Sequence, residues 1–153
     1  MTAKELWNEF VKENGPLDCE YEAWAFGVDA DLLAQLVASG EKTATASAFP
    51  LYEVDGDPLP CAGEYSVILD SSDRAVCIIR TDKVTVVPFN QVTVEHTFRE
   101  GEGDKSLDYW RDVHKKVFTE WMSESGLEFT EDMPVVCEEF SVVYRAKEHK
   151  QKE

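Results

Sequence analysis

The 153-residue sequence predicts an α+β domain whose sheet, of mixed or mostly antiparallel strands, curls into a β-barrel with flanking helices. Three observations lead to this fold class. Apolar residues recur at helical spacing in two segments before Thr43, and strand-like β-branched runs follow it. Helical spacing returns once, late in the chain, before a last strand-like run. No repeat or linker interrupts this order, so residues 1–146 are expected to form one domain and 147–153 a frayed polar tail.

Two helices, over residues 2–15 and 29–40, are predicted to precede the sheet. Asp29 is expected to cap the second helix, and Gly40 to follow its last turn. The stretch between the helices, residues 17–27, is rich in aromatic residues but has no regular period, so it is expected to be irregular. The stripes expected to be buried are Leu6, Trp7, Phe10 and Val11 in the first helix and Leu32, Leu33, Leu36 and Val37 in the second.

Four strand-like segments are predicted to form the sheet, over residues 43–49, 64–70, 75–89 and 134–145. A long helix over residues 106–126 is expected before the last of them. Its apolar stripe is Leu107, Trp110, Val113, His114, Val117, Phe118 and Trp121.

The charge balance limits the function classes. Asp and Glu total 31 against 15 for Lys and Arg, a formal net charge of −16. Such a chain repels a phosphate backbone, so duplex DNA is not an expected partner and any RNA contact must come from a local, basic pocket. Small or neutral substrates are favoured for the same reason. No apolar run approaches the ~20 residues that cross a bilayer, and the charged N-terminus is unlike a signal peptide. A cytoplasmic protein without membrane contact is therefore expected.

The four cysteines, Cys19, Cys61, Cys77 and Cys137, do not have metal-site spacing. No metal and no cofactor is predicted. Because Cys77 and Cys137 lie in apolar strand-like segments, they are expected to be buried, reduced thiols.

The segment "SGEKTATAS", residues 39–47, contains the first candidate site. Lys42 and Thr45 lie three positions apart at a helix-to-strand junction. A desolvated lysine loses its proton more easily and can then act as a base on a hydroxyl nucleophile. The structural alternative is a solvated charge at a strand edge. Neither residue is expected in the core, so alanine variants of both are expected to stay folded.

The segment "REGEGDKS", residues 99–106, contains the second candidate site. Glu100 and Glu102 alternate with glycines just before the long helix, and carboxylates on such a turn can act as a general acid or base. The alternative is an acidic loop that leads into a capped helix. A third candidate is the aromatic pair Tyr21 and Trp24, which could stack on a flat base or plug one end of the core.

The order of these features resembles the ASCH domains (activating signal cointegrator homology), relatives of the PUA-like β-barrels of RNA-modifying proteins. "LVASGEKTATAS" is similar to their G-x-K-x-x-T core. "FREGEGDKSLDYWRDVH" is similar to a segment of one bacterial subgroup of small stand-alone ASCH proteins. The resemblance extends from about Trp24 to Tyr144.

The resemblance implies a PUA-like barrel that binds RNA or a modified nucleoside or nucleotide in a cleft lined by the lysine-bearing turn. Some small bacterial members act as amidohydrolases on acetylated cytidine through a lysine, a threonine and a glutamate. Lys42 and Thr45 match the first two positions, and Glu100 is preferred to Glu102 for the third. The residues expected to line the cleft are Gly40, Ser47, Tyr21, Trp24 and Glu102.

The chain departs from the family pattern where many members carry an arginine shortly after the lysine, because residues 46–48 here are Ala, Ser and Ala. Three functions stay open: an RNA or nucleoside binding module, a small amidohydrolase, and a protein-interaction domain with a vestigial pocket. For the hydrolase, Thr45 is the expected nucleophile or water ligand, Lys42 its base and Glu100 the proton shuttle. Backbone amides near Gly40, or the Ser47 hydroxyl, are expected to stabilise the oxyanion.

Overall fold

Five strands form one mixed sheet, in the order β1-β3-β4-β5-β2, in the computed structural model, which describes residues 1–15 and 19–147. The β1–β3 pairing is parallel, and the pairings β3–β4, β4–β5 and β5–β2 are antiparallel. The strands are β1 (Tyr21–Trp24), β2 (Ala44–Ala48), β3 (Tyr65–Leu69), β4 (Ala75–Pro88) and β5 (Pro134–Arg145). The α+β class and the mixed, mostly antiparallel sheet are thus confirmed.

The sheet is open, and the predicted closed barrel is not formed. Closure requires hydrogen bonds between the two edge strands, β1 and β2, and these strands do not pair with each other. Both are short, and their side chains line a cleft on the same side of the sheet. The cleft therefore lies between the two edges that a closed barrel would join.

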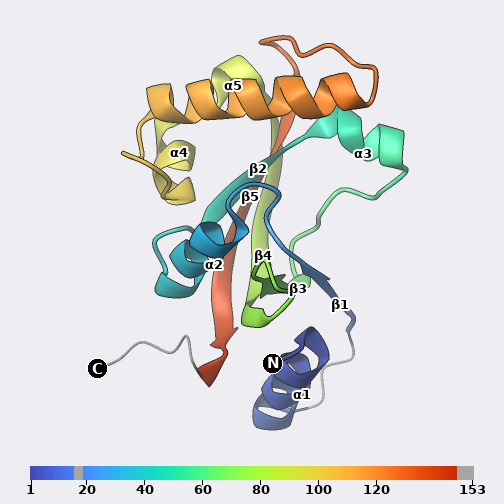
Figure 1. Cartoon of the computed structure of the whole chain (residues 1–153), viewed down its shortest axis with the longest axis vertical. Coiled ribbons are helices and arrows are strands. Elements are labelled where there is room, and N and C mark those ends of the chain that lie inside the picture. The colour runs from blue at the N-terminus through green and yellow to red at the C-terminus, as the bar shows by residue number, and fades with distance from the viewer. Residues whose placement is uncertain (16–18, 148–153) are drawn as a thin grey trace.

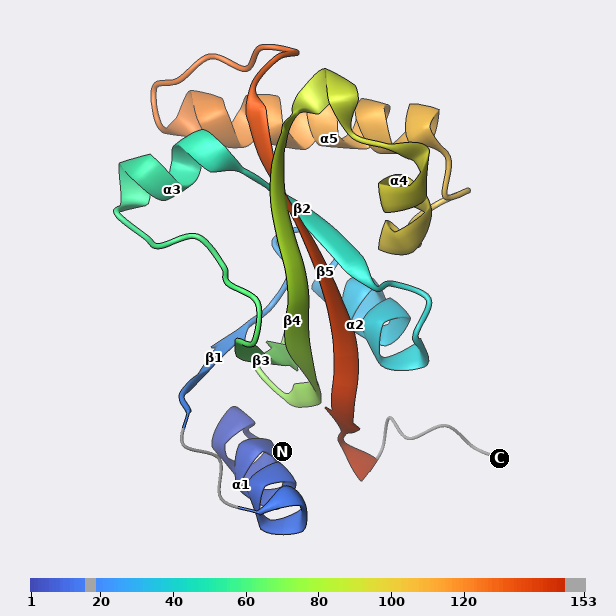
Figure 2. The same cartoon turned by 180° about the vertical axis from the view of Figure 1, so that it is seen from behind.

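The helices surround this sheet. Figures 1 and 2 show α5 across one end of the long strands β4 and β5, with α1 near the other end and α2 against one face. The helices are α1 (Ala3–Asn14), α2 (Ala30–Ser39), α3 (Phe49–Asp55), α4 (Val94–Glu100) and α5 (Leu107–Glu124), with a 3-10 turn η1 at Phe89–Gln91. The predicted helices α1, α2 and α5 are confirmed, whereas α3 and α4 were not predicted. Each of these two has 7 residues, too few to show a helical period in the sequence.

Helix α2 differs from its prediction in two details. Asp29 occupies the N-cap position, but its side chain makes no capping hydrogen bond and its backbone is left-handed, with φ 47°. Leu32 is 51% exposed, while Ala34 and Ala38 are buried beside Val37. The buried face of the helix is thus centred on the alanines and Val37, and Leu32 lies outside it. Gly40 follows the last turn with φ 87°, as expected.

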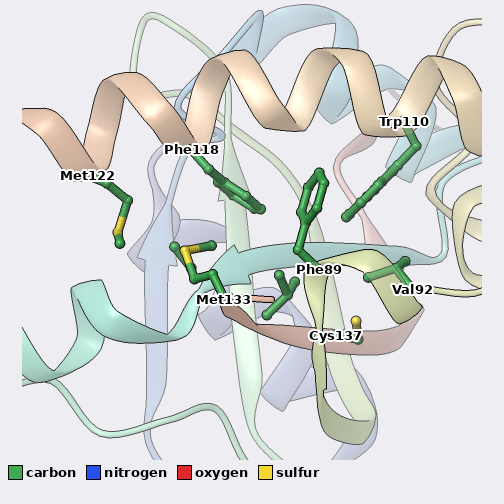
Figure 3. Close-up of a cluster of buried hydrophobic side chains, with 9 residues drawn as sticks. Phe89, Val92, Trp110, Phe118, Met122, Met133 and Cys137 are labelled. Atoms are coloured by element: carbon green, nitrogen blue, oxygen red, sulfur yellow. The ribbon is translucent and has the colours of Figure 1, made fainter. Parts of the chain in front are cut away.

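Three apolar clusters hold the layers together. Helix α1 packs a cluster around Leu6 and Phe10 onto one face of strands β3 and β4, and α2 packs a second cluster on the other face. This double cover explains the unbroken apolar run at residues 75–79, because both faces of β4 are buried there. The third cluster lies beneath α5, where Phe89, Trp110 and Phe118 come together (Figure 3).

Cys77 and Cys137 are buried, free thiols, as predicted. Burial raises the pKa of each thiol to about 12. Cys19 and Cys61 are exposed and unpaired. Within the described residues no helix is long and apolar enough to cross a bilayer. Residues 148–153 of the predicted tail lie outside the described chain.

Candidate active site

A cleft of about 400 Å³ opens beside the sheet, and we refer to it as the main cleft. All five strands contribute side chains to it, among them Glu22, Trp24, Thr45, Ser66, Thr81 and Glu138. A smaller space of about 80 Å³, the lysine recess, adjoins it and is lined by Lys42, Glu100, Glu102 and His114. The two share the lining residues Phe26, Gly27, Thr45, Ala46 and Trp121.

Lys42 is the deepest charge of the recess. Its side chain is 1% exposed, and its ammonium Nζ lies 2.8 Å from Glu102 Oε2 and 3.5 Å from Glu100 Oε1. The Phe26 ring covers it, with 5.5 Å between Nζ and the ring centroid. A buried ammonium is tolerated only when it is paired, and the two carboxylates provide that pairing.

Glu100 is fully surrounded by donors. His96 Nε2 lies 2.7 Å and Trp110 Nε1 2.6 Å from Oε2, while Oε1 faces Lys42 and, at 3.6 Å, His114 Nε2. Burial acts to raise the pKa of Glu100, but the hydrogen bond with His96 and the nearby Lys42 and His114 outweigh it and lower that pKa to about 2. Glu100 is therefore a fixed anion near neutral pH.

The recess forms because the end of α4 packs on the turn between α2 and β2. Lys42 N–H donates to Leu36 C=O, and Thr43 N–H donates to Arg99 C=O at 2.7 Å. Gly101 ends α4 with φ 69°, and a Cβ there would lie 2.4 Å from Glu41 O. Only glycine permits this approach, which places Glu100 and Glu102 against Lys42.

The main cleft beyond the recess has its own polar groups. Thr81 Oγ1 donates to Glu138 Oε2 at 2.7 Å, and the hydroxyls of Ser47 and Tyr52 are 2.7 Å apart. Glu138 pairs with Thr45 across β5 and β2, so the two side chains lie on the same face of the sheet. Burial, and then the charges of nearby carboxylates, raise the pKa of Glu138 against the opposing hydrogen bond from Thr81.

Six of the predicted site residues come together in these two spaces. The structure places Lys42, Thr45, Glu100 and Glu102 in the recess, and Trp24 and Ser47 in the main cleft. It does not bring Gly40 or Tyr21 to either space. The Gly40 amide donates to Val37 C=O within the helix cap, so it is not free for an oxyanion.

Tyr21 and Trp24 are separated because the stretch expected to be irregular contains strand β1. Side chains alternate between the faces of a strand. Trp24 therefore lines the cleft, while Tyr21 stacks on Trp7 of α1, with 4.7 Å between ring centroids. The loop prediction is wrong for residues 21–24, and a four-residue strand leaves too short an alternation to detect.

Two further expectations are corrected. Lys42 was expected outside the core, yet it is among the largest fully buried side chains, because partners 58 and 60 residues away enclose it. Glu100 was expected in a loop, yet it is the last residue of α4. Only Glu102 occupies the following loop, with a side chain that is 21% exposed.

Sequence reasoning missed His96, Trp110 and Glu138 as parts of the site. His96 lies four residues before Glu100, a helical spacing that would have shown the contact once α4 was recognised. Glu138 stands inside an apolar strand, and a carboxylate in that position is itself an indication of a polar cavity. Trp110 gave no such indication, since it fits an apolar stripe.

Comparison with known proteins gives the family. The ASCH domain profile matches residues 22–144. The ASCH domain structure from Lactobacillus crispatus JV V101 is 31% identical, with a TM-score of 0.86 over 93% of this chain and 94% of that chain. A protein of solved structure from Enterococcus faecalis V583 is 33% identical, with a TM-score of 0.84 over 98% of this chain and 96% of that one. A search of curated proteins finds no match. The chain belongs to the ASCH domain family.

Proposed function

We propose that this protein is a small amidohydrolase that removes an acyl group from a modified nucleoside held in the main cleft. The observation that carries the proposal is Lys42, a buried ammonium between two carboxylates at the side of an open cleft. Burying such a charge costs several kcal/mol even when it is paired, and an apolar residue of similar size would be cheaper. A chemical role accounts for this arrangement better than a vestigial pocket in an interaction domain does.

Thr45 is the group best suited to attack. Its side chain lines both the recess and the main cleft, and its hydroxyl makes no hydrogen bond within residues 1–15 and 19–147. An unengaged hydroxyl beside a lysine can act as the nucleophile or hold the attacking water.

Glu102 is the better candidate for proton transfer than Glu100. Glu100 is held ionised by its donors and has a pKa of about 2, so it suits the role of an electrostatic anchor for Lys42. Glu102 contacts the same ammonium at 2.8 Å and retains solvent contact. In the proposed order, Lys42 passes a proton to Glu102 and then accepts the proton of the Thr45 hydroxyl or its water as the carbonyl is attacked. Glu102 delivers its proton to the nitrogen when the C–N bond breaks. Where Thr45 itself has attacked, a water then hydrolyses the acyl–threonine ester: Glu102 accepts the proton of the water, Lys42 returns a proton to the Thr45 oxygen, the carboxylic acid leaves, and Glu102 passes its proton back to Lys42.

The main cleft supports a small, flat ligand. Its volume of about 400 Å³ lies in the usual range for small-molecule sites of roughly 300–1,000 Å³. Aromatic rings from Trp24, Tyr52 and Trp121 line it and offer surfaces on which a base can stack. ASCH domains are generally associated with RNA, but the glutamates of this cleft favour an isolated nucleoside over a phosphate-bearing strand.

The test is hydrolysis of N-acetylcytidine by the purified full chain, with cytidine and acetate detected by mass. Thr45→Val and Glu102→Gln are expected to lower kcat by roughly a hundredfold or more. Thr45→Ser, which keeps the hydroxyl, is expected to retain activity. Thr85→Val is the matched control, because Thr85 is an exposed threonine of β4 that lines neither space.

Lys42 needs a volume-conserving variant. Contrary to the expectation from sequence, Lys42→Ala removes the cation from two carboxylates, at a cost of about 3–5 kcal/mol, and adds the cost of a buried cavity. Lys42→Met keeps the volume and is expected to abolish turnover in a protein whose far-UV circular dichroism is unchanged. Full activity of Thr45→Val or Lys42→Met would rule out the mechanism.

A further inference from the structure

Glu138 is a buried carboxylate that the proposed reaction does not use. It is 9% exposed and lies on the floor of the main cleft, opposite Thr45 in the β2–β5 pairing. Its Oε2 accepts the hydrogen bond from Thr81. Its Oε1 has no hydrogen-bond partner in the described part of the chain. Arg111 Nε is the fully buried side-chain atom without a partner among the described residues, so the Oε1 of Glu138 is accessible from the cleft, where it can accept a hydrogen bond from a ligand.

The surroundings of Glu138 select the charge of that ligand. Two more carboxylates, Glu22 and Glu64, line the main cleft, and among its described lining residues there is no lysine, arginine or histidine. An anionic group placed there would meet like charges without any compensating cation. A positively charged group would gain from all three carboxylates.

The aromatic lining favours the same class of ligand. Trp24, Tyr52 and Trp121 contribute to the walls of this cleft. The faces of aromatic rings attract cations, most strongly where water is displaced. Carboxylates combined with aromatic walls are the usual protein surroundings of ammonium and amidinium groups.

We propose that the main cleft contains a recognition subsite for a positively charged nitrogen group of the ligand, with Glu138 as its anchoring carboxylate. The subsite deepens the proposed function, on which it rests only for the choice of the cleft as the ligand site. The preferred ligand then has two ends, an acyl amide at the lysine recess and an ammonium or amidinium group at Glu138, whereas the neutral test substrate N-acetylcytidine supplies only the first. A phosphate group is excluded from this subsite.

The test is a series of three probes with one shape and different charges: benzylammonium, benzyl alcohol and benzoate. Each is titrated into the purified full chain, and the indole N–H resonances of Trp24 and Trp121 report binding by NMR. Benzylammonium is expected to bind about tenfold or more tightly than the alcohol, and benzoate to show no binding. Equal affinities, or tighter binding of benzoate, would overturn the proposal.

Variants identify the anchor. Glu138→Gln is expected to weaken benzylammonium binding by about tenfold and to leave benzyl alcohol binding unchanged. Glu120→Gln, on the exposed side of α5, makes the same change in net charge away from the cleft and is expected to have no effect. If Glu138→Gln binds all three probes as the parent does, Glu138 is not the anchor and the proposal fails.

Failure of this proposal is distinguishable from failure of the proposed hydrolysis. The probes carry no amide, so their binding does not depend on Lys42 chemistry. A charge preference that depends on Glu138, without turnover of any acylated nucleoside, would keep the subsite and reject the hydrolase. Turnover without a charge preference would keep the hydrolase and reject the subsite.

Discussion

Glu100 and Glu138 show how two buried carboxylates in one protein acquire opposite properties. Burial acts to raise the pKa of both. Glu100 has donors on both oxygens, including two histidines and a lysine, so its charged form is stabilised. Glu138 has a single hydroxyl donor and faces Glu22 and Glu64, so its charged form is destabilised. The number and charge of the hydrogen-bond donors, and not the depth of burial alone, decide which carboxylate is a stable anion.

This contrast gives a prediction at the residue scale for Glu138→Gln. The pKa of Glu138 is raised in the folded protein, so ionisation above the unfolded pKa weakens the fold. The amide cannot ionise and can still accept the Thr81 hydrogen bond. The variant is therefore expected to melt at a higher temperature than the parent near pH 7. The gain in melting temperature is expected to vanish below about pH 4, where Glu138 of the parent is protonated in both the folded and the unfolded protein.

Thermal melts across this pH range check the prediction, with Glu120→Gln as the control for net charge. A lower melting temperature for Glu138→Gln near neutral pH would show that Glu138 is stabilised by its surroundings. The same melts establish that the variant is folded, which the probe titrations require.

At the scale of elements, the short helix α4 supplies several of the groups that position Lys42. It has 7 residues, yet it supplies His96 and Glu100, and its C-terminal glycine sets the distance to the lysine turn. Helix α5 has a double role, because Trp110 belongs both to the apolar cluster of Figure 3 and to the donors of Glu100. Packing of the core and geometry of the site are therefore linked through these two helices.

Two glycine substitutions test the role of this contact. Gly40 and Gly101 both have left-handed backbones, but a Cβ at Gly40 meets open space, whereas one at Gly101 meets the Glu41 backbone at 2.4 Å. Gly40→Ala is expected to cost about 1–2 kcal/mol of unfolding free energy from backbone strain alone. Gly101→Ala is expected to cost more and to impair hydrolysis, because the α4 end must move away from Lys42.

Urea unfolding of both variants measures the difference, with Gly40→Ala as the matched control for backbone conformation. Equal costs for the two substitutions would mean that the close approach of α4 and the lysine turn is not required for stability.

At the scale of the whole molecule, the net charge of −16 and the acidic main cleft act in the same direction. The sequence left open a local basic pocket that would bind RNA weakly and with a steep salt dependence. The described lining of the main cleft has no cation, and Lys42 in the recess is already paired with carboxylates. Long-range repulsion of phosphate is therefore not offset at this site.

Duplex RNA and duplex DNA are accordingly expected not to bind at physiological salt, and to remain unbound when the salt concentration is lowered. Fluorescence anisotropy of labelled duplexes measures this, and the isolated modified nucleoside is the positive control. Duplex binding that strengthens steeply at low salt would show a basic surface elsewhere on the molecule.

The long elements were predictable from local pattern alone. Helices α1 and α5 carry an apolar stripe over several turns, and strands β4 and β5 carry long β-branched runs, so each segment specifies its own period. Lys42, Thr45 and the two glutamates could be named as candidates from residue type and position, and the motif that they form identified the family before any geometry was known.

Short elements and burial depended on contacts between distant segments. Strand β1 exists because it pairs with β3, and its pleat separates Tyr21 from Trp24. The sheet stays open because its two edges line a cleft and do not pair, which no single segment could indicate. The sequence alone predicts a surface position for Lys42. It is buried because α4 and the loop after it bring two carboxylates to it from 58 and 60 residues away. Local sequence specifies period and residue type, whereas the environment of a charge is set by whichever groups the tertiary fold places around it.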